Sequence, residues 1–122
     1  MKIYIATPVN GRKEKTLVEK RQKAYERVCE VKKILLERYP DAEVHSSFDS
    51  NIAPMDAAQL KRMYGGMPTE AQVMGKCVQC VMECDLLCLD DGWSLSRGCK
   101  TEFNVAYHYG IQRMYLEEED RL

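Results

Sequence analysis

Asp85-Leu86-Leu87-Cys88-Leu89 is a short apolar segment with polar residues on both sides. Its apolar residues follow one another almost without interruption, which is typical of a strand buried on both faces of a parallel sheet. A polar loop over residues 90–98 comes next, and a helix is predicted over residues 99–109, closed by Gly110. A last strand is predicted over residues 111–116. The last third of the chain therefore alternates strand, helix and strand.

The rest of the chain repeats this alternation. A first strand is predicted over residues 2–6, where β-branched and aromatic residues are followed at once by Thr7-Pro8. Residues 14–39 carry apolar side chains at helical spacing, with charged residues between them. The other predicted elements are a strand over 42–45, a short helix over 56–63, and a helix that Thr69 caps and that runs to about residue 83.

Strands that alternate with helices predict an α/β fold, a flavodoxin-like or Rossmann-like three-layer sandwich. We expect four or five mostly parallel strands with helices on both faces, in a single domain over residues 1–122. Ligands of such sheets bind beyond the carboxyl ends of the strands. This rule singles out three loops, over residues 7–12, 45–51 and 90–98.

The composition excludes several classes of protein. Apolar residues make up 45% of the 122 residues and charged residues 30%, which is unlike a disordered or a membrane protein. The net charge of −1 argues against general binding to nucleic acid or to a membrane surface. No apolar run is long enough to span a bilayer, and the first residues lack the pattern of a signal peptide. A cytoplasmic location is the expectation.

The six cysteines allow two interpretations. Cys77, Cys80, Cys84 and Cys88 are spaced three, four and four residues apart, which invites a zinc or cluster site. Only the first pair forms a CxxC motif, and no second such motif or histidine pair completes a set of four ligands. On a helix, Cys77, Cys80 and Cys84 would share one buried stripe, where cysteine behaves as a small apolar residue. We favour that interpretation and expect no metal.

The loop over residues 90–98 carries the most chemistry. Ser94, Ser96, Arg97 and Gly98 precede a helix N-terminus, and hydroxyls, a guanidinium and free backbone amides together suit a phosphate. Glu102 follows on that helix, where the helix dipole is expected to keep it ionised and able to act as a nucleophile. The alternative is structural: Ser96 caps the helix, Arg97 is solvated and Glu102 complements the dipole.

Three segments also resemble a known family. The resemblance is to the nucleoside 2-deoxyribosyltransferase-like superfamily, in particular to its small bacterial and phage branch of unknown function. The similar segments are residues 4–12, residues 85–89, and residues 92–98 followed by Glu102. The motif Ser96-x-Gly98-x-x-x-Glu102 resembles the active-site segment of 2′-deoxynucleoside 5′-phosphate N-hydrolases. This resemblance implies that Ser96 holds the 5′-phosphate, that Glu102 is the nucleophile and that Tyr4 positions it.

The resemblance also implies roles for the first loop. Gly11 and Arg12, in the loop that Thr7 begins, match the glycine- and arginine-bearing loop near the sugar phosphate. One part of the pattern is missing, because no aspartate stands at the distance before residues 85–89 where the family has its general acid. Asp49, Asp90 and Asp91 could reach in from loops, and Glu70 and Glu83 are the nearest acids on that side of the sequence.

Three functions follow as hypotheses. The favoured one is cleavage or transfer of the N-glycosidic bond of 2′-deoxynucleotides or deoxynucleosides, with the monophosphate N-hydrolase preferred and no cofactor. The second is a nucleotide-binding module of the same fold that has lost catalysis, and the third is a metal or redox protein built on the cysteines. The expected partners are a small nucleotide or nucleoside and a second copy of the chain, because seven Met and seven Tyr leave apolar surface to cover.

Overall fold

The computed structural model describes residues 1–9 and 13–116, and its centre is a parallel sheet. The four strands are β1 (Lys2–Ala6), β2 (Glu43–Ser46), β3 (Leu86–Leu89) and β4 (Gln112–Tyr115). Their order is β2-β1-β3-β4, and every neighbouring pair is parallel. This is the order of the flavodoxin-like sheet, in which ligands bind between the first and third strands. The predicted fold class is confirmed.

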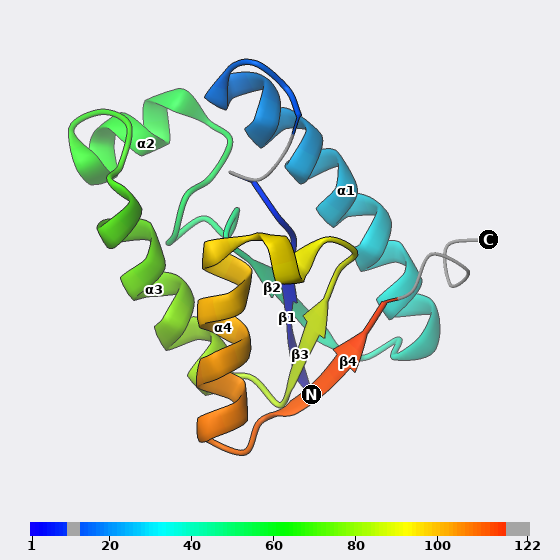
Figure 1. Ribbon diagram of the computed structural model, residues 1–122. Coiled ribbons are helices and arrows are strands. Elements are labelled where there is room, and N and C mark those ends of the chain that lie inside the picture. The colour runs from blue at the N-terminus through cyan, green and yellow to red at the C-terminus, as the bar shows by residue number, and fades with distance from the viewer. Residues whose placement is uncertain (10–12, 117–122) are drawn as a thin grey trace.

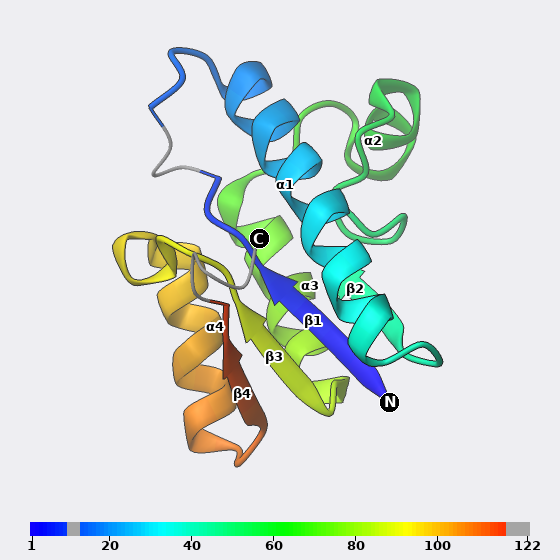
Figure 2. The same cartoon turned by 90° about the vertical axis from the view of Figure 1, so that its right-hand side faces the viewer.

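Helices cover both faces of the sheet (Figures 1 and 2). Helix α1 (Leu17–Arg38) lies on one face, whereas α3 (Glu70–Glu83) and α4 (Arg97–His108) lie on the other. The short helix α2 (Ala57–Tyr64) lies beyond the carboxyl ends of the strands, and a 3-10 turn, η1 (Trp93–Leu95), precedes α4. Among the described residues, no helix combines the length and the apolar character that crossing a bilayer requires.

The alternation of side chains along the strands divides the core into two clusters. Ile3 and Ile5 of β1 pack with α1, whereas Tyr4 and Ala6 face α3 and α4. Strand β3 is buried on both faces, which accounts for its continuous apolar sequence. The register places Tyr4 between His45 of β2 and Leu87 of β3, so these three side chains share the face that α3 and α4 cover.

Capping residues explain where the helices begin. Thr16 accepts a hydrogen bond from the amide of Glu19, so α1 starts at Leu17, three residues later than predicted. Ser96 accepts one from the amide of Cys99, so α4 starts at Arg97, two residues earlier than predicted. Gly110 follows the end of α4 with a φ of 69°, the left-handed conformation predicted for it. The early start of α4 places its first turn directly after η1.

Candidate functional site

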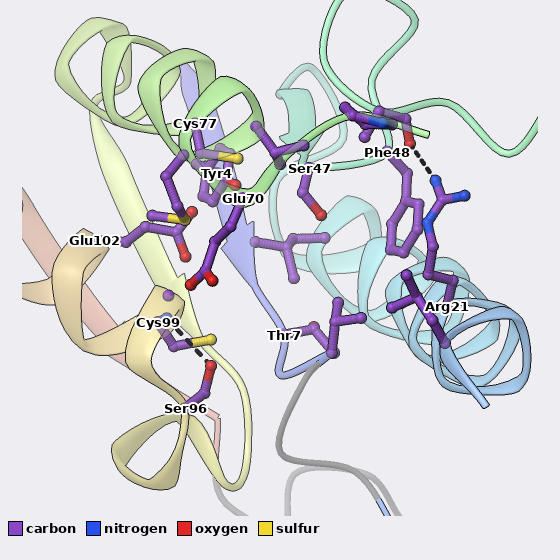
Figure 3. A pocket seen from close by; sticks show the side chains of 18 of the residues that line it. Tyr4, Thr7, Arg21, Ser47, Phe48, Glu70, Cys77, Ser96, Cys99 and Glu102 are labelled. Carbon is purple, nitrogen blue, oxygen red and sulfur yellow. Dashed lines mark hydrogen bonds between the residues drawn. The ribbon is translucent and has the colours of Figure 1, made fainter. Parts of the chain in front are cut away.

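A pocket of about 300 Å³ opens at the carboxyl edge of the sheet, where the predicted loops meet. Strand β1, helices α1, α3 and α4, and the loop after β2 all contribute to it (Figure 3). The residues that line it are Tyr4, Ile5, Thr7, Val9, Leu17, Arg21, Ser47, Phe48, Ala53, Met67, Pro68, Glu70, Val73, Met74, Cys77, Ser96, Gly98, Cys99 and Glu102.

Three side chains from three elements meet in this pocket. Tyr4 comes from β1, Cys77 from α3 and Glu102 from α4, and all three are buried. The Tyr4 hydroxyl interacts with both the Glu102 carboxyl and the Cys77 thiol. The structure therefore brings together, at the pocket, the two residues that the sequence analysis assigned to catalysis.

Burial controls the charge of Glu102. Its side chain is withdrawn from solvent, and burial raises the pKa of its carboxyl to about 8, although the hydrogen bond from Tyr4 acts in the opposite direction. The prediction that the helix dipole keeps Glu102 ionised is therefore wrong. Glu102 lies in the second turn of α4, and the dipole acts mainly within the first. Burial also raises the pKa of Tyr4 well above its ordinary value and that of Cys77 to about 12.

Ser96 and Gly98 form the wall of the pocket at the start of α4. The Ser96 oxygen accepts a hydrogen bond of 3.3 Å from the amide of Cys99, which leaves its own hydroxyl proton available to a ligand. Gly98 packs closely as well, because a Cβ at this position would lie 3.4 Å from the sulfur of Met74. The structural interpretation of Ser96 as a cap is confirmed, and the same residue lines the pocket.

Of the other described residues from the loops predicted to bind the substrate, Ser94 and Arg97 lie outside the pocket lining, whereas Thr7 is part of it. Ser94 is exposed on η1, and the exposed Arg97 pairs at 3.3 Å with Glu70, which stands at the pocket. Thr7 does line the pocket, and its hydroxyl donates a hydrogen bond of 3.3 Å to Asp90. Gly11 and Arg12 lie outside the described residues.

The three aspartates suggested as the acid do not line the pocket. Asp90 is buried beside α1, where its carboxylate accepts two hydrogen bonds of 2.9 Å from the guanidinium of Arg27. Asp49 accepts one from His45 in a different pocket. Asp91 is exposed in the loop after β3. Of the residues that line the pocket, Glu70 and Glu102 are the acids.

The opposite wall of the pocket was not predicted from the sequence. Arg21 of α1 donates hydrogen bonds to the carbonyl oxygens of Ala53 and Pro54, and its guanidinium lies 5.6 Å from the centre of the Phe48 ring. Figure 3 shows Arg21 and Phe48 across the pocket from Glu102. In the sequence, Arg21 is one of many charged residues of α1. Only its position near the N-terminus of that helix, on the side that faces the strand ends, sets it apart from the others.

The fold and this pocket define a doubly wound α/β protein with a pocket at the carboxyl edge of its sheet. The chain belongs to the family described as "Domain of unknown function (DUF4406)", which matches residues 1–115. It matches no curated protein and no solved structure. The site itself must therefore support any statement about function.

Proposed function

We propose that this protein cleaves the N-glycosidic bond of a 2′-deoxynucleoside 5′-monophosphate, with Glu102 as the nucleophile. The observation that carries the proposal is the buried Glu102 carboxyl, which interacts with Tyr4 in a pocket whose wall is the start of α4. The resemblance of the Ser96-x-Gly98-x-x-x-Glu102 motif to monophosphate N-hydrolases supports the same choice of substrate.

The proposed chemistry uses the two ends of the pocket. Cleavage of an N-glycosidic bond develops positive charge on the sugar, which an ionised Glu102 stabilises before it bonds to the anomeric carbon. Water then releases the sugar phosphate and restores the carboxylate. The phosphate sits at Ser96 and the amides of the first turn of α4, far from the reacting carbon, and so orients the sugar.

Glu70 is the proposed acid for the departing base. It lines the same pocket as Glu102, and its pairing with Arg97 holds it at the rim. Protonation of the leaving base is worth about 10²–10⁴-fold in rate. Glu70→Gln should therefore slow base release by about that factor, whereas Glu83→Gln on the same helix should leave it unchanged. Equal rates of base release for Glu70→Gln and the unaltered protein would show that Glu70 is not the acid.

A second candidate is a nucleotide-binding module without turnover. The observation that favours it is that Asp49, Asp90 and Asp91 all lie outside the pocket lining, so the acid of the resembled family has no aspartate counterpart there. Such a module would bind a monophosphate and release no base.

Transfer of the sugar to a second base is closely related to hydrolysis, and it requires a free acceptor base in the pocket.

A homodimer is part of the proposal. Trp93, Phe103 and Tyr107 stack in sequence along η1 and α4, with Arg113 of β4 over two of these rings. Leu95, next to Ser96, is 85% exposed. An aromatic surface of this kind, with arginine among the rings, has the composition of a protein interface. A second copy seated there would lie beside the start of α4 and its pocket.

The deciding experiment incubates the protein with each of the common deoxynucleoside and ribonucleoside monophosphates and measures free base by chromatography. We expect release from at least one deoxynucleoside monophosphate, and none with Glu102→Ala. A parallel reaction with a free acceptor base detects an exchanged nucleotide, which only a transferase makes. Binding of a monophosphate by calorimetry without any base release would establish the module instead.

A further inference from the structure

A second pocket, of about 220 Å³, lies between β2 and the end of α3 and contains a group of metal-ligand side chains. His45 is on β2, Asp49 is in the loop that follows, and Cys80 is on α3. One ligand atom from each of these residues lies within 4.8 Å of the other two. Cys84, one helical turn after Cys80, lines the same pocket.

From this arrangement we infer that His45, Asp49, Cys80 and Cys84 form a binding site for one divalent zinc-like ion. Two thiolates, an imidazole and a carboxylate are ligands that Zn²⁺ accepts in a tetrahedral site. In such a site the ligand atoms lie about 3.3–3.8 Å apart, because Zn–S bonds are about 2.3 Å and Zn–N bonds about 2.0 Å long. The ligand atoms of His45, Asp49 and Cys80 already lie within 4.8 Å of one another, and Cys84, which lines the same pocket, would turn toward them to supply the fourth ligand. This inference does not depend on the function proposed for the other pocket.

The fold places these ligands together from two distant segments. His45 and Tyr4 are register partners, so His45 faces the helix α3 side of the sheet. His45 Nδ1 lies 2.6 Å from the Asp49 carboxylate and Nε2 lies 3.1 Å from that of Glu43. Both ring nitrogens of His45 therefore lie beside negatively charged groups.

The charge balance also suits a cation. Two thiolates and one carboxylate carry three negative charges, so a bound divalent ion leaves a single negative charge. Lys2 and Lys76 line the same pocket and can offset it. On binding, the thiol protons and any proton on the coordinating imidazole nitrogen pass to solvent.

The ion would connect two walls of the first pocket. The loop after β2 carries Ser47 and Phe48, and α3 carries Glu70 and Cys77. A metal bond between this loop and α3 would hold both walls in place. Cys77 takes no part in the proposed site, because it faces Tyr4 and Glu102 in the other pocket. The stripe of three cysteines predicted from the sequence is therefore divided between two pockets.

Metal titration of the reduced full-length protein tests the inference. With Co²⁺ as the probe, we expect one ion per chain, intense tetrahedral visible bands and a near-ultraviolet band from thiolate ligands. Zn²⁺ should displace the Co²⁺ and raise the melting temperature, because it binds the folded chain. A titration without a thiolate band, or without saturation at one equivalent, would overturn the inference.

Matched variants identify the ligands. His45→Asn, Asp49→Asn, Cys80→Ser and Cys84→Ser should each weaken Co²⁺ binding by at least about 10-fold. His108→Asn and Cys29→Ser change the same residue types at exposed positions on α4 and α1, and should leave affinity and spectrum unchanged. Circular dichroism of the metal-free variants verifies that they fold. Unchanged affinity in any of the four ligand variants, or an equal loss in the two controls, would contradict the four-ligand site.

Discussion

At the scale of single residues, Glu102 is the group whose environment most affects its chemistry. Nearly all other carboxyls of the described chain are at the surface or in ion pairs, whereas Glu102 is 5% exposed and faces Tyr4 and Cys77. A buried carboxyl with a pKa of about 8 is half ionised near pH 8 and mostly protonated at pH 7. Such a perturbed group in a pocket is typical of a functional site.

The pH dependence of base release follows from that pKa. A nucleophilic Glu102 must be ionised, so in Glu70→Gln, which lacks the proposed acid, kcat/KM should rise as the pH increases toward about 8 and level off above it. Below the pKa the increase should approach about 10-fold per pH unit. Initial rates at low substrate concentration from pH 5.5 to 9.5 provide the profile. A profile that falls above pH 8 would mean that Glu102 acts in its protonated form, as an acid.

Stability should change with pH in the opposite direction. The pKa of Glu102 is raised from an ordinary 4.5 to about 8 on folding, so the folded state holds a proton that the unfolded chain releases. This contribution is fully present below about pH 4.5 and is lost as the pH rises toward 8. Glu102→Gln cannot ionise and should escape this loss.

The measurement is urea unfolding of both proteins between pH 5 and pH 8. The free energy of unfolding of Glu102→Gln relative to the unaltered protein should increase by up to about 1.4 kcal/mol per pH unit. Glu83→Gln, an exposed carboxyl on α3, should show no such slope. A pH-independent difference between Glu102→Gln and the unaltered protein would place the pKa of Glu102 near its ordinary value.

At the scale of elements, the start of α4 combines a cap with a ligand site. Ser96 accepts the hydrogen bond from the Cys99 amide and also lines the pocket. Ser96→Ala removes both functions, and we expect a loss of about 1 kcal/mol of stability from the cap. The preference for a monophosphate over its nucleoside should fall by about 1–3 kcal/mol, since a hydrogen bond to a charged group is lost.

Ser96→Asp separates the two functions. Aspartate caps a helix as well as serine does, so stability should stay close to that of the unaltered protein. Its carboxylate opposes a phosphate at the same place, so the preference for a monophosphate should fall by more than in Ser96→Ala. Thermal unfolding and calorimetric titration with a deoxynucleoside and its monophosphate provide the two readouts. An unchanged monophosphate preference in Ser96→Asp would show that the phosphate binds elsewhere.

Features that depend on neighbouring residues in the sequence could be predicted, whereas contacts between distant segments could not. The continuous apolar run of β3 and the cap at Ser96 are local features, so the strands and the start of α4 could be predicted within one to three residues. Asp90 could not be placed, because its partner Arg27 is 63 residues away. The meeting of His45 with Cys80 depends on the pairing of β1 with β2 and on how α3 crosses that sheet face.

At the scale of the whole molecule, the β4 edge and the outer side of α4 present the aromatic surface proposed as the dimer interface. Trp93 lies 5.9 Å from Tyr115 and 4.8 Å from Phe103, measured between ring centres, so the surface extends from β4 to α4. Burying apolar area stabilises an interface by about 25 cal/mol per Å². A specific interface is expected to bury at least about 1,000 Å² in total.

Light scattering at micromolar concentration should therefore report about twice the chain mass of 14.1 kDa. Tyr107 is 62% exposed within this surface, and Tyr107→Glu would place a charge among the packed rings of both copies. We expect this variant to sediment as a monomer. Val18→Glu is the matched control, because Val18 is 71% exposed on α1, on the other side of the sheet, and should leave the dimer intact. Two outcomes would show that the aromatic surface is not the interface and that the pocket is formed within one chain. The unaltered protein would have the mass of a single chain at this concentration, or both variants would dissociate equally.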